Sequence, residues 1–414
     1  MSSQASIDST VEGLGAALCR GVPRTCPVCA NDVGVTLFEN RMAPCAGYDF
    51  SSPILRCTSC DAAYAGYALK APDLNRYYST LSKYDTLRAR SDISAIDRER
   101  AHLAADFLER YLGSLTHVLD VGCSSGLLLH ELRELGVKRV HGIDPAADAP
   151  AVARALFNVP VVQAQAETYE EYGNYDLICL MAVLEHLLEP RHLLGAIGRQ
   201  MRPGGRVLIE VPDAGAFDRP GDSRPIEAFG EFSNEHINFF SISDIRRLGL
   251  AANLEVEHWK TARLSTGSAD LFVLLRRMPA ASELRAPDAG SAVSRLNSGE
   301  AVQYYVSRST LAMEEIERRL AVACRGAVLI YGAGNHTARL LVQSPALARA
   351  DVRAVFDRNH HLQGNTIGAL PILAPNRLGE FSLCPVIIST LNARHEIHAE
   401  LSAVTSRPLF LLYD

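Results

Sequence analysis

The stretch Val118-Leu-Asp-Val-Gly-Cys-Ser-Ser-Gly126 decides the fold of this chain. Its apolar start predicts a buried strand, and its small residues predict a tight turn before the helical sequence LLLHELRELG. Gly122 and Gly126 lack a Cβ atom, so the backbone of this turn can approach a ligand closely. The third small position is Ser124, which fits D-x-G-x-S-x-G better than the G-x-G-x-x-G of dinucleotide sites. The stretch therefore predicts a strand, turn and helix that bind a nucleotide-like ligand.

Strand and helix patterns alternate on the C-terminal side of this turn. Asp144 ends the next strand, 24 residues after Asp120 (144 − 120), where a carboxylate can accept hydrogen bonds from both hydroxyls of a ribose. The sequences VPVVQAQAE, YDLICLMAV, RVLIEVP and ADLFVLLRR predict further strands. Such alternation predicts an α/β fold with a doubly wound sheet.

The pattern Asp-Val-Gly-Cys-Ser-Ser-Gly resembles motif I of class I S-adenosylmethionine-dependent methyltransferases. The sequence LEHL after the fourth strand, and Pro203-Gly204-Gly205 before the fifth, are similar to the continuation of that family. The resemblance implies a Rossmann-like methyltransferase domain with S-adenosylmethionine as cofactor, and it places Glu167 near the adenine. The residues expected at the cofactor are Asp120, Gly122, Cys123, Ser124, Gly126, Asp144, Pro145, Glu167 and Ala182.

Six of the ten cysteines fall in the first sixty residues. Cys26-Pro-Val-Cys29 and Cys57-Thr-Ser-Cys60 form two Cys-x-x-Cys pairs, separated by the 27 residues 30–56. Two such pairs can complete a tetrahedral Cys₄ zinc site, which has no open position for a substrate and is therefore structural. Cys45 lies between the pairs and is a spare or substitute ligand in this interpretation. The predicted zinc ligands are Cys26, Cys29, Cys57 and Cys60.

A polar loop, Glu231-Phe-Ser-Asn-Glu-His-Ile-Asn-Phe-Phe-Ser241, follows the fifth strand. Ligands bind at the carboxyl ends of the strands in open α/β sheets, so this loop is a candidate for the reacting groups. The cysteine pairs, a Tyr-Tyr-Ser stretch, the methyltransferase core, the Glu-His loop and a C-terminal α/β domain together resemble the sugar-nucleotide C-methyltransferases. That family methylates a carbon beside a 4-keto group on a nucleoside-diphosphate deoxysugar.

The resemblance assigns catalytic roles because carbon becomes nucleophilic only after a neighbouring proton is removed. It makes His236 the base, with Glu235 orienting or assisting it. His186 and a tyrosine, Tyr78, are expected to hydrogen-bond to an enolate or to place the sugar, and Tyr77 and Tyr84 are further candidates for this tyrosine. His186 is equally well explained as a helix-start cap or a cofactor contact. Phe239 and Phe240 are expected to pack in the core.

The C-terminal part of the chain predicts a second Rossmann-like α/β domain after a polar linker at 279–300 and a helix at 303–323. Its turn, Tyr331-Gly-Ala-Gly-Asn-His-Thr337, departs from the Tyr-Gly-Ala-Ala-Ala-Lys-Gly expected of the C-methyltransferases. The missing lysine leaves open the carrier of the substrate and whether carbon, oxygen or nitrogen is methylated. A substrate site, an NAD site and a scaffold without ligand are all compatible with this turn.

Composition limits the partners of the chain. The 414 residues carry a formal net charge of −6, no basic excess, no apolar run long enough for a membrane and no secretory pattern at the start. We therefore predict a cytoplasmic protein without nucleic-acid or membrane partners. The predicted domains are a small zinc-binding module (20–75), a methyltransferase domain (76–278) and a C-terminal α/β domain (300–414).

The predicted function is C-methylation of a nucleotide-linked keto-deoxysugar through an enolate, in deoxysugar biosynthesis. The alternatives are an O- or N-methyltransferase that acts on a sugar or another small metabolite, and a non-catalytic protein that keeps the folds as scaffolds.

Overall fold

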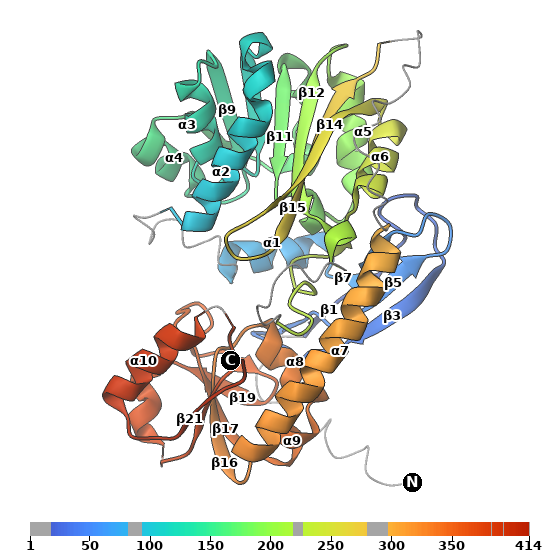
Figure 1. Ribbon diagram of the computed structural model, residues 1–414. Coiled ribbons are helices and arrows are strands. Elements are labelled where there is room, and N and C mark those ends of the chain that lie inside the picture. Colours follow the sequence, from blue (N-terminus) through green and yellow to red (C-terminus); the bar gives the residue numbers. More distant parts are fainter. Residues whose placement is uncertain are drawn as a thin grey trace. The chain divides into compact units, whose positions relative to one another are not determined.

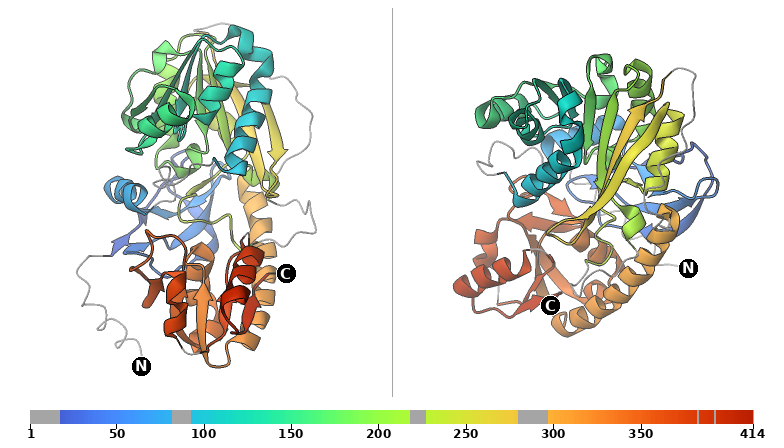
Figure 2. Two further views of the ribbon diagram at one scale, coloured as in Figure 1. Left: turned by 90° about the vertical axis from the view of Figure 1, so that its left-hand side faces the viewer. Right: turned by 45° about the horizontal axis from the view of Figure 1, so that its top comes forward.

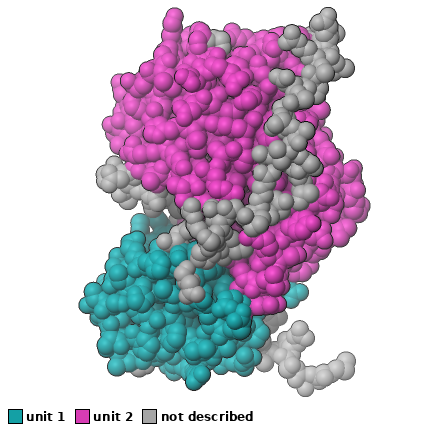
Figure 3. Space-filling model, viewed as in Figure 1, with its two compact units in different colours: residues 1–22, 41–51, 315–414 teal, residues 23–40, 52–314 magenta. Residues whose placement is uncertain are grey.

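The computed structural model describes residues 18–81, 93–217, 227–279, 297–381, 383–391 and 393–413. The candidate Tyr84 and most of the predicted linker at 279–300 lie outside these ranges. The chain divides into two compact units, shown in Figure 3: unit 1 contains residues 1–22, 41–51 and 315–414, and unit 2 contains residues 23–40 and 52–314. This division differs from the three predicted domains, whose boundaries stay a prediction.

The centre of unit 2 is a seven-stranded sheet with the strand order β10-β9-β8-β11-β12-β15-β14. Its first five strands are parallel, and β15 and β14 are antiparallel. The strands are β8 (His117–Val121), β9 (Arg139–Asp144), β10 (Val161–Gln163), β11 (Leu177–Met181), β12 (Arg206–Pro212), β14 (Leu254–Arg263) and β15 (Ala269–Arg277). The order reverses direction at β8, next to β11, which is where doubly wound sheets bind ligands.

Helices cover both faces of this sheet (Figures 1 and 2). Alternate strand residues point to opposite faces, so Val118 packs in one apolar cluster and Leu119 in the other. The first cluster includes side chains of α2 (Ala95–Leu108), α3 (Leu127–Glu134) and α4 (Ala149–Phe157). The second includes side chains of α5 (Pro190–Gln200) and α6 (Ile242–Ala251). The predicted α/β fold with a Rossmann-like sheet is confirmed.

Short elements connect and extend the sheet. Helix α2 continues after Leu108 as the 3₁₀-helix η2 (Glu109–Ser114), whose tighter turns are common at helix ends. Helix α7 begins at Ser298, inside the segment predicted as linker, and ends at Ala323. The described residues of unit 2 also form the 3₁₀-helices η3 (Ala166–Thr168), η4 (Tyr172–Asn174), η5 (Leu184–His186) and η6 (Ala214–Ala216).

Unit 2 also contains a four-stranded sheet with the order β13-β6-β5-β3 and a separate pair of strands, β2 and β7. We call residues 23–40 and 52–70 of this unit the cysteine module. Its strands are followed by helix α1, which carries two of the candidate tyrosines. The elements are β2 (Val22–Pro23), β3 (Gly34–Asn40), β5 (Ser52–Cys57), β6 (Ala63–Ala65), β7 (Tyr67–Ala68), α1 (Ala71–Thr80) and β13 (Asn238–Phe239).

Unit 1 is a second α/β unit with the strand order β18-β19-β17-β16-β20-β21, and all pairs except β18–β19 are parallel. Cys45 belongs to this unit, where its strand bridge joins it to Ile367 and burial raises the pKa of its thiol to about 12. The elements are β1 (Cys19–Arg20), β4 (Tyr48–Asp49), β16 (Ala327–Tyr331), α8 (Asn335–Gln343), α9 (Pro345–Arg349), β17 (Asp351–Phe356), β18 (Thr366–Ile367), β19 (Leu370–Leu373), η7 (Pro375–Glu380), β20 (Val386–Ile388), α10 (Arg394–Val404) and β21 (Leu409–Leu411).

Candidate active site and metal centre

The turn between β8 and α3 needs its two glycines. Gly122 and Gly126 have φ values of +73° and +78°, a region that strains residues with a side chain. A Cβ atom on Gly122 would lie 2.8 Å from Cγ2 of Val183, and one on Gly126 would lie 2.5 Å from Cγ2 of Val159. These contacts are too short for carbon atoms, so the path of the turn depends on glycine at both positions.

Asp144 joins this turn to the end of β9. One carboxylate oxygen accepts a hydrogen bond from the amide of Ser124 and the other accepts one from the amide of Ala146, each at 2.8 Å. A carboxylate has about four acceptor sites, so both oxygens can still accept hydrogen bonds from ribose hydroxyls. Burial raises the pKa of Asp144.

Asp120, near the end of β8, is buried, and one of its carboxyl oxygens has no hydrogen-bond partner among the described residues. It is 3% exposed, and no group among the described residues donates a hydrogen bond to its Oδ1. Burial, together with the charge of Asp144, raises the pKa of Asp120 to about 8. A cationic ligand beside Asp120 would stabilise its ionised form and so offset both the burial and the repulsion by Asp144. S-adenosylmethionine carries a sulfonium and an ammonium group, so its charge fits this position.

The other predicted cofactor residues differ in exposure. Cys123 is buried beneath the turn, and its thiol fills the space beside Gly142, where an added Cβ would lie 2.5 Å from Sγ. Ala182 follows β11 with a φ of +52° and donates its amide to the carbonyl of Glu210. Pro145 and Glu167 are exposed. The structure therefore brings the turn, Asp120 and Asp144 together, and shows no hydrogen bond from the Glu167 side chain to them among the described residues.

Two histidines meet beyond the end of β11, the strand that pairs with β8. His186 ends η5 directly after β11, and its ring centroid lies 5.0 Å from that of His236 in an edge-on arrangement. Nδ1 of His186 lies 3.0 Å from the backbone oxygen of Glu235, which assigns a proton to Nδ1 and leaves Nε2 as the acceptor. The hydroxyl of Tyr78 lies 3.5 Å from the same Nδ1. The four predicted catalytic residues, His236, Glu235, His186 and Tyr78, thus converge.

The sequence named Tyr77 as a candidate but did not predict its contact with Glu235, and it did not single out Glu185. The hydroxyl of Tyr77 donates to Oε1 of Glu235 at 3.1 Å, and Asn234 donates to that hydroxyl at 2.7 Å. Oε1 of Glu185 lies 3.9 Å from Nε2 of His186, and burial raises the pKa of Glu185 to about 8. The signal available for Glu185 was its place beside His186 in LEHL.

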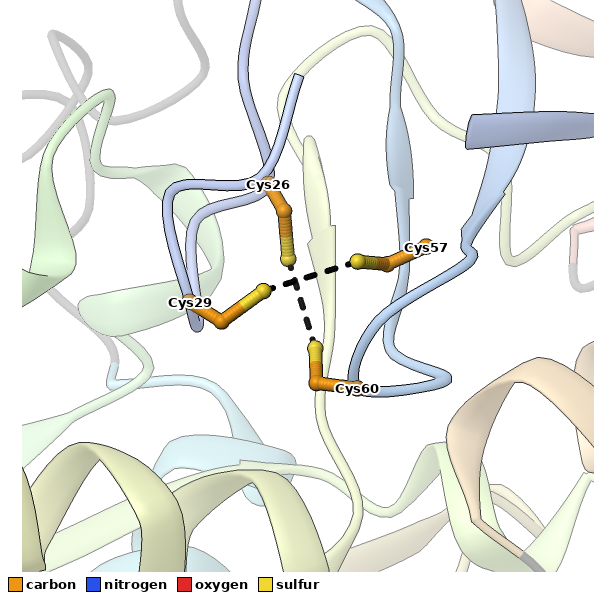
Figure 4. Close-up of side chains that lie close together, drawn as sticks. All are labelled: Cys26, Cys29, Cys57 and Cys60. Atoms are coloured by element: carbon orange, nitrogen blue, oxygen red, sulfur yellow. Dashed lines mark hydrogen bonds between the residues drawn. The ribbon is translucent and has the colours of Figure 1, made fainter. Parts of the chain in front are cut away.

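The four predicted metal ligands converge as well (Figure 4). Sγ of Cys26 lies 3.5 Å from Sγ of Cys60, and Sγ of Cys29 lies 3.5 Å from that of Cys57. Zn–S bonds of about 2.3 Å in a tetrahedron require sulfur–sulfur distances of about 3.8 Å. The amide of Ser59 also points at the sulfur of Cys57, at 3.4 Å. Donor type and spacing therefore fit a zinc ion.

Comparison with known proteins locates the relationship in unit 2. Residues 96–259 match the family model described as a methyltransferase domain. The chain contains a methyltransferase domain. The matched residues include the turn, Asp120, Asp144 and both histidines, His186 and His236. The four clustered cysteines lie before the match.

Curated relatives of the methyltransferase domain are named for O-methylation. The ubiquinone biosynthesis O-methyltransferase of Aeromonas salmonicida (strain A449) is 33% identical over 150 residues, which cover 34% of this chain and 63% of the relative. The enzyme of that name from Sodalis glossinidius (strain morsitans) is 34% identical over 144 residues, covering 32% and 57%. The chain thus matches less than two thirds of the length of either relative.

One similar solved structure is a 1,6-didemethyltoxoflavin-N1-methyltransferase from Burkholderia thailandensis. The aligned region covers 54% of this chain and 98% of the solved chain, with 19% sequence identity and a TM-score of 0.39.

Within the described residues, no helix combines the length and apolar character needed to cross a membrane.

Proposed function

We propose that this chain is an S-adenosylmethionine-dependent methyltransferase that acts on a small molecule. The observation that carries the proposal is the position of two imidazoles at the end of β11, next to the β8 turn that holds Asp120 and Asp144. When bound, S-adenosylmethionine supplies an electrophilic methyl group. The glycine turn and Asp144 would hold the cofactor, and Asp120 would face its positive charge.

The chain's own residues would prepare the acceptor for methyl transfer. His236 would remove a proton from the acceptor atom, because a neutral imidazole is a base matched to neutral pH. His186 would be oriented by the contact between its Nδ1 and the backbone oxygen of Glu235, with its Nε2 on the side of Glu185. Burial raises the pKa of Tyr77, so its hydroxyl stays protonated and donates to Glu235.

Oxygen is the acceptor that the comparisons support better than carbon, because the curated relatives are named O-methyltransferases. A second candidate is methylation of a carbon beside a keto group, as in a nucleotide-linked keto-deoxysugar. The observation in its favour is the Tyr78 hydroxyl beside the imidazole pair, because an enolate oxygen needs a hydrogen-bond donor as well as a base.

The experiment that separates these candidates uses S-adenosylmethionine labelled with ¹³C in its methyl group. Phenols, hydroxylated metabolites and keto-sugar nucleotides are offered as substrates, and the product is read by ¹³C NMR. Methoxyl and C-methyl carbons resonate far apart, so one spectrum identifies the methylated atom. A scaffold protein would yield no product and would show no cofactor binding by calorimetry.

We expect about one zinc ion per chain, because four thiols with tetrahedral spacing are brought together. Cys57→Ser should lose the metal and lower the melting temperature, since a structural zinc site contributes to folding free energy. Metal analysis of the purified protein checks this. Cys324→Ser, which alters a cysteine of unit 1, is the control and should keep the metal. The site would be refuted if the parent protein is purified without bound zinc and Cys57→Ser is as stable as the parent.

Asp144→Ala should weaken S-adenosylmethionine binding by about 1.5–3 kcal/mol, the scale of hydrogen bonds to a charged group. The loss has two sources, because the carboxylate would bind the ribose and also holds the amides of Ser124 and Ala146. Calorimetry measures the affinity. Asp144→Asn keeps an acceptor oxygen and should lose less. Equal affinity of parent and Asp144→Ala would show that the ribose lies elsewhere.

A further inference from the structure

Arg24 connects the cysteine module to the candidate active site. It precedes the first metal-ligand candidate, Cys26, by two residues. Arg24 is partly buried, and its guanidinium is charged at neutral pH. A charged group that is removed from water is costly unless its N–H groups are hydrogen-bonded. The partners that satisfy it therefore indicate which parts of the fold it stabilises.

These partners belong to both loops that carry the histidines. Nη1 of Arg24 donates to the backbone oxygens of Ala65, at 3.1 Å, and of Ile237, at 3.0 Å. Nη2 donates to the backbone oxygen of Leu188, at 3.3 Å, and to Oδ1 of Asn238, at 2.8 Å. One planar group thus contacts the chain two residues after His186 and one residue after His236.

Asn238 completes the connection between the two loops. While its side-chain oxygen accepts from Arg24, its side-chain amide donates to the backbone oxygens of Leu184 and Leu187, both at 2.8 Å. The residues on either side of His186 are therefore tied to the segment that carries His236. Arg24 and Asn238 thus link the two segments that carry these imidazoles, whose ring centroids are 5.0 Å apart.

The histidine loops have little regular structure of their own. His186 ends a three-residue 3₁₀-helix, and His236 precedes the two-residue strand β13. That strand pairs with β6 of the cysteine module, where Asn238 is opposite Tyr64, and the amide of Ala65 donates to the oxygen of Ile237 at 2.9 Å. Elements this short gain little stability from backbone hydrogen bonds alone. Their geometry therefore depends on the side-chain contacts from the cysteine module.

We infer that Arg24 is a positioning residue through which the cysteine module sets the geometry of His186 and His236. The effect that we infer on the reaction rate rests on the proposed function, whereas the effect on the positions of the two histidines does not. In its absence the carbonyls of Leu188 and Ile237 lose their charged donor, and the two loops separate. The cofactor turn makes none of these contacts, so S-adenosylmethionine affinity is unaffected.

Arg24→Ala and Arg24→Lys test this inference. Misplacement of catalytic groups by about 1 Å costs on the order of 10²-fold in rate, so we expect kcat of Arg24→Ala to fall by about that factor at unchanged cofactor affinity. Arg24→Lys keeps the charge and should recover part of the rate. Asn238→Asp keeps the acceptor for Arg24 but loses both donors to the Leu184–Leu187 segment, and it should resemble Arg24→Ala.

Arg247→Ala is the matched control. Arg247, on α6, donates to the backbone oxygen of Cys60 and pairs with Asp244 at 3.8 Å, and none of its recorded contacts is with a histidine loop. It therefore reports general loosening of the cysteine module. Its kcat and metal content should stay close to those of the parent.

Nitrogen NMR of the histidine rings provides a readout that needs no substrate. In the parent, the spectrum of His186 should show the proton on Nδ1, and Arg24→Ala should shift it toward the Nε2–H form as the contact with Glu235 is lost. Parental kcat and parental tautomer in a folded Arg24→Ala would overturn the inference, as would equal losses in Arg247→Ala. If the parent lacks methyltransferase activity, the proposed function fails, and the tautomer measurement still decides the role of Arg24.

Discussion

His236→Ala should lower the rate of methyl transfer by about 10²–10⁴-fold while leaving cofactor affinity nearly unchanged. Methyl transfer is an in-line displacement that depends on positioning, but the acceptor must first lose its proton. His236 lies beside His186 and after the buried Glu235, whereas the cofactor turn is formed by other segments. Single-turnover kinetics with the parental substrate measure the step directly.

His192→Ala is the control for this substitution, because His192 is an exposed histidine on α5. It should leave the rate unchanged. If the acceptor is a carbon, His236→Ala should also abolish exchange of the substrate's acidic proton with deuterated water in the absence of methyl donor. Exchange at the parental rate would show that another group is the base. If the acceptor is oxygen, the lost rate should recover as the pH approaches the pKa of the substrate hydroxyl.

The local elements of the fold could be predicted because each is encoded in consecutive residues. The stretch 118–126 contains an apolar strand, two glycines and the start of a helix, and the structure has β8, the turn and α3 at these positions. Asp144 and the two cysteine pairs follow from the same kind of local pattern. Strand ends and short knuckles bring such residues together whenever the fold forms.

Contacts between distant segments could not be predicted in this way. Arg24 reaches Asn238 across 214 positions, and Tyr77 reaches Glu235 across 158. No periodicity in the sequence links such pairs, because they meet only after the cysteine module pairs with the loop that follows β12. Arg24 also looks like an ordinary surface arginine in the sequence, since its hydrogen-bond acceptors are mostly backbone oxygens, which any residue supplies.

The same limit applies to residues 41–51, which interrupt the cysteine module in the sequence. In the structure they belong to unit 1, where the amide of Ala43 donates to the oxygen of Ala338 and the amide of Gly368 donates to the oxygen of Pro44. Cys45 therefore contacts residues of unit 1 and is not one of the four clustered thiols. The structure does not support its interpretation as a spare metal ligand. Spacing between cysteines cannot show that a loop leaves the module and returns.

Asp120→Asn should make the protein more stable without cofactor and less able to bind S-adenosylmethionine. The folded-state pKa of Asp120, about 8, is raised above the unfolded value by burial and by Asp144. A raised carboxyl pKa means that the folded protein holds a proton which the unfolded chain releases, so stability falls as the pH rises between the two values. Asparagine has no proton to lose and escapes this penalty.

The gain in unfolding free energy of Asp120→Asn over the parent should therefore grow by about 1.4 kcal/mol per pH unit, from about pH 4 to about pH 8, and then level off. Chemical denaturation across this range measures it, and Asp32→Asn, at an exposed carboxylate, is the control. The affinity for S-adenosylmethionine should fall in Asp120→Asn, because a neutral amide does not attract a sulfonium or ammonium group as a carboxylate does. A stabilised Asp120→Asn protein that still binds S-adenosylmethionine with parental affinity would show that the buried carboxyl group serves something other than the cofactor's charge. A variant that loses both stability and affinity would show instead that Asp120 is needed to build the turn itself.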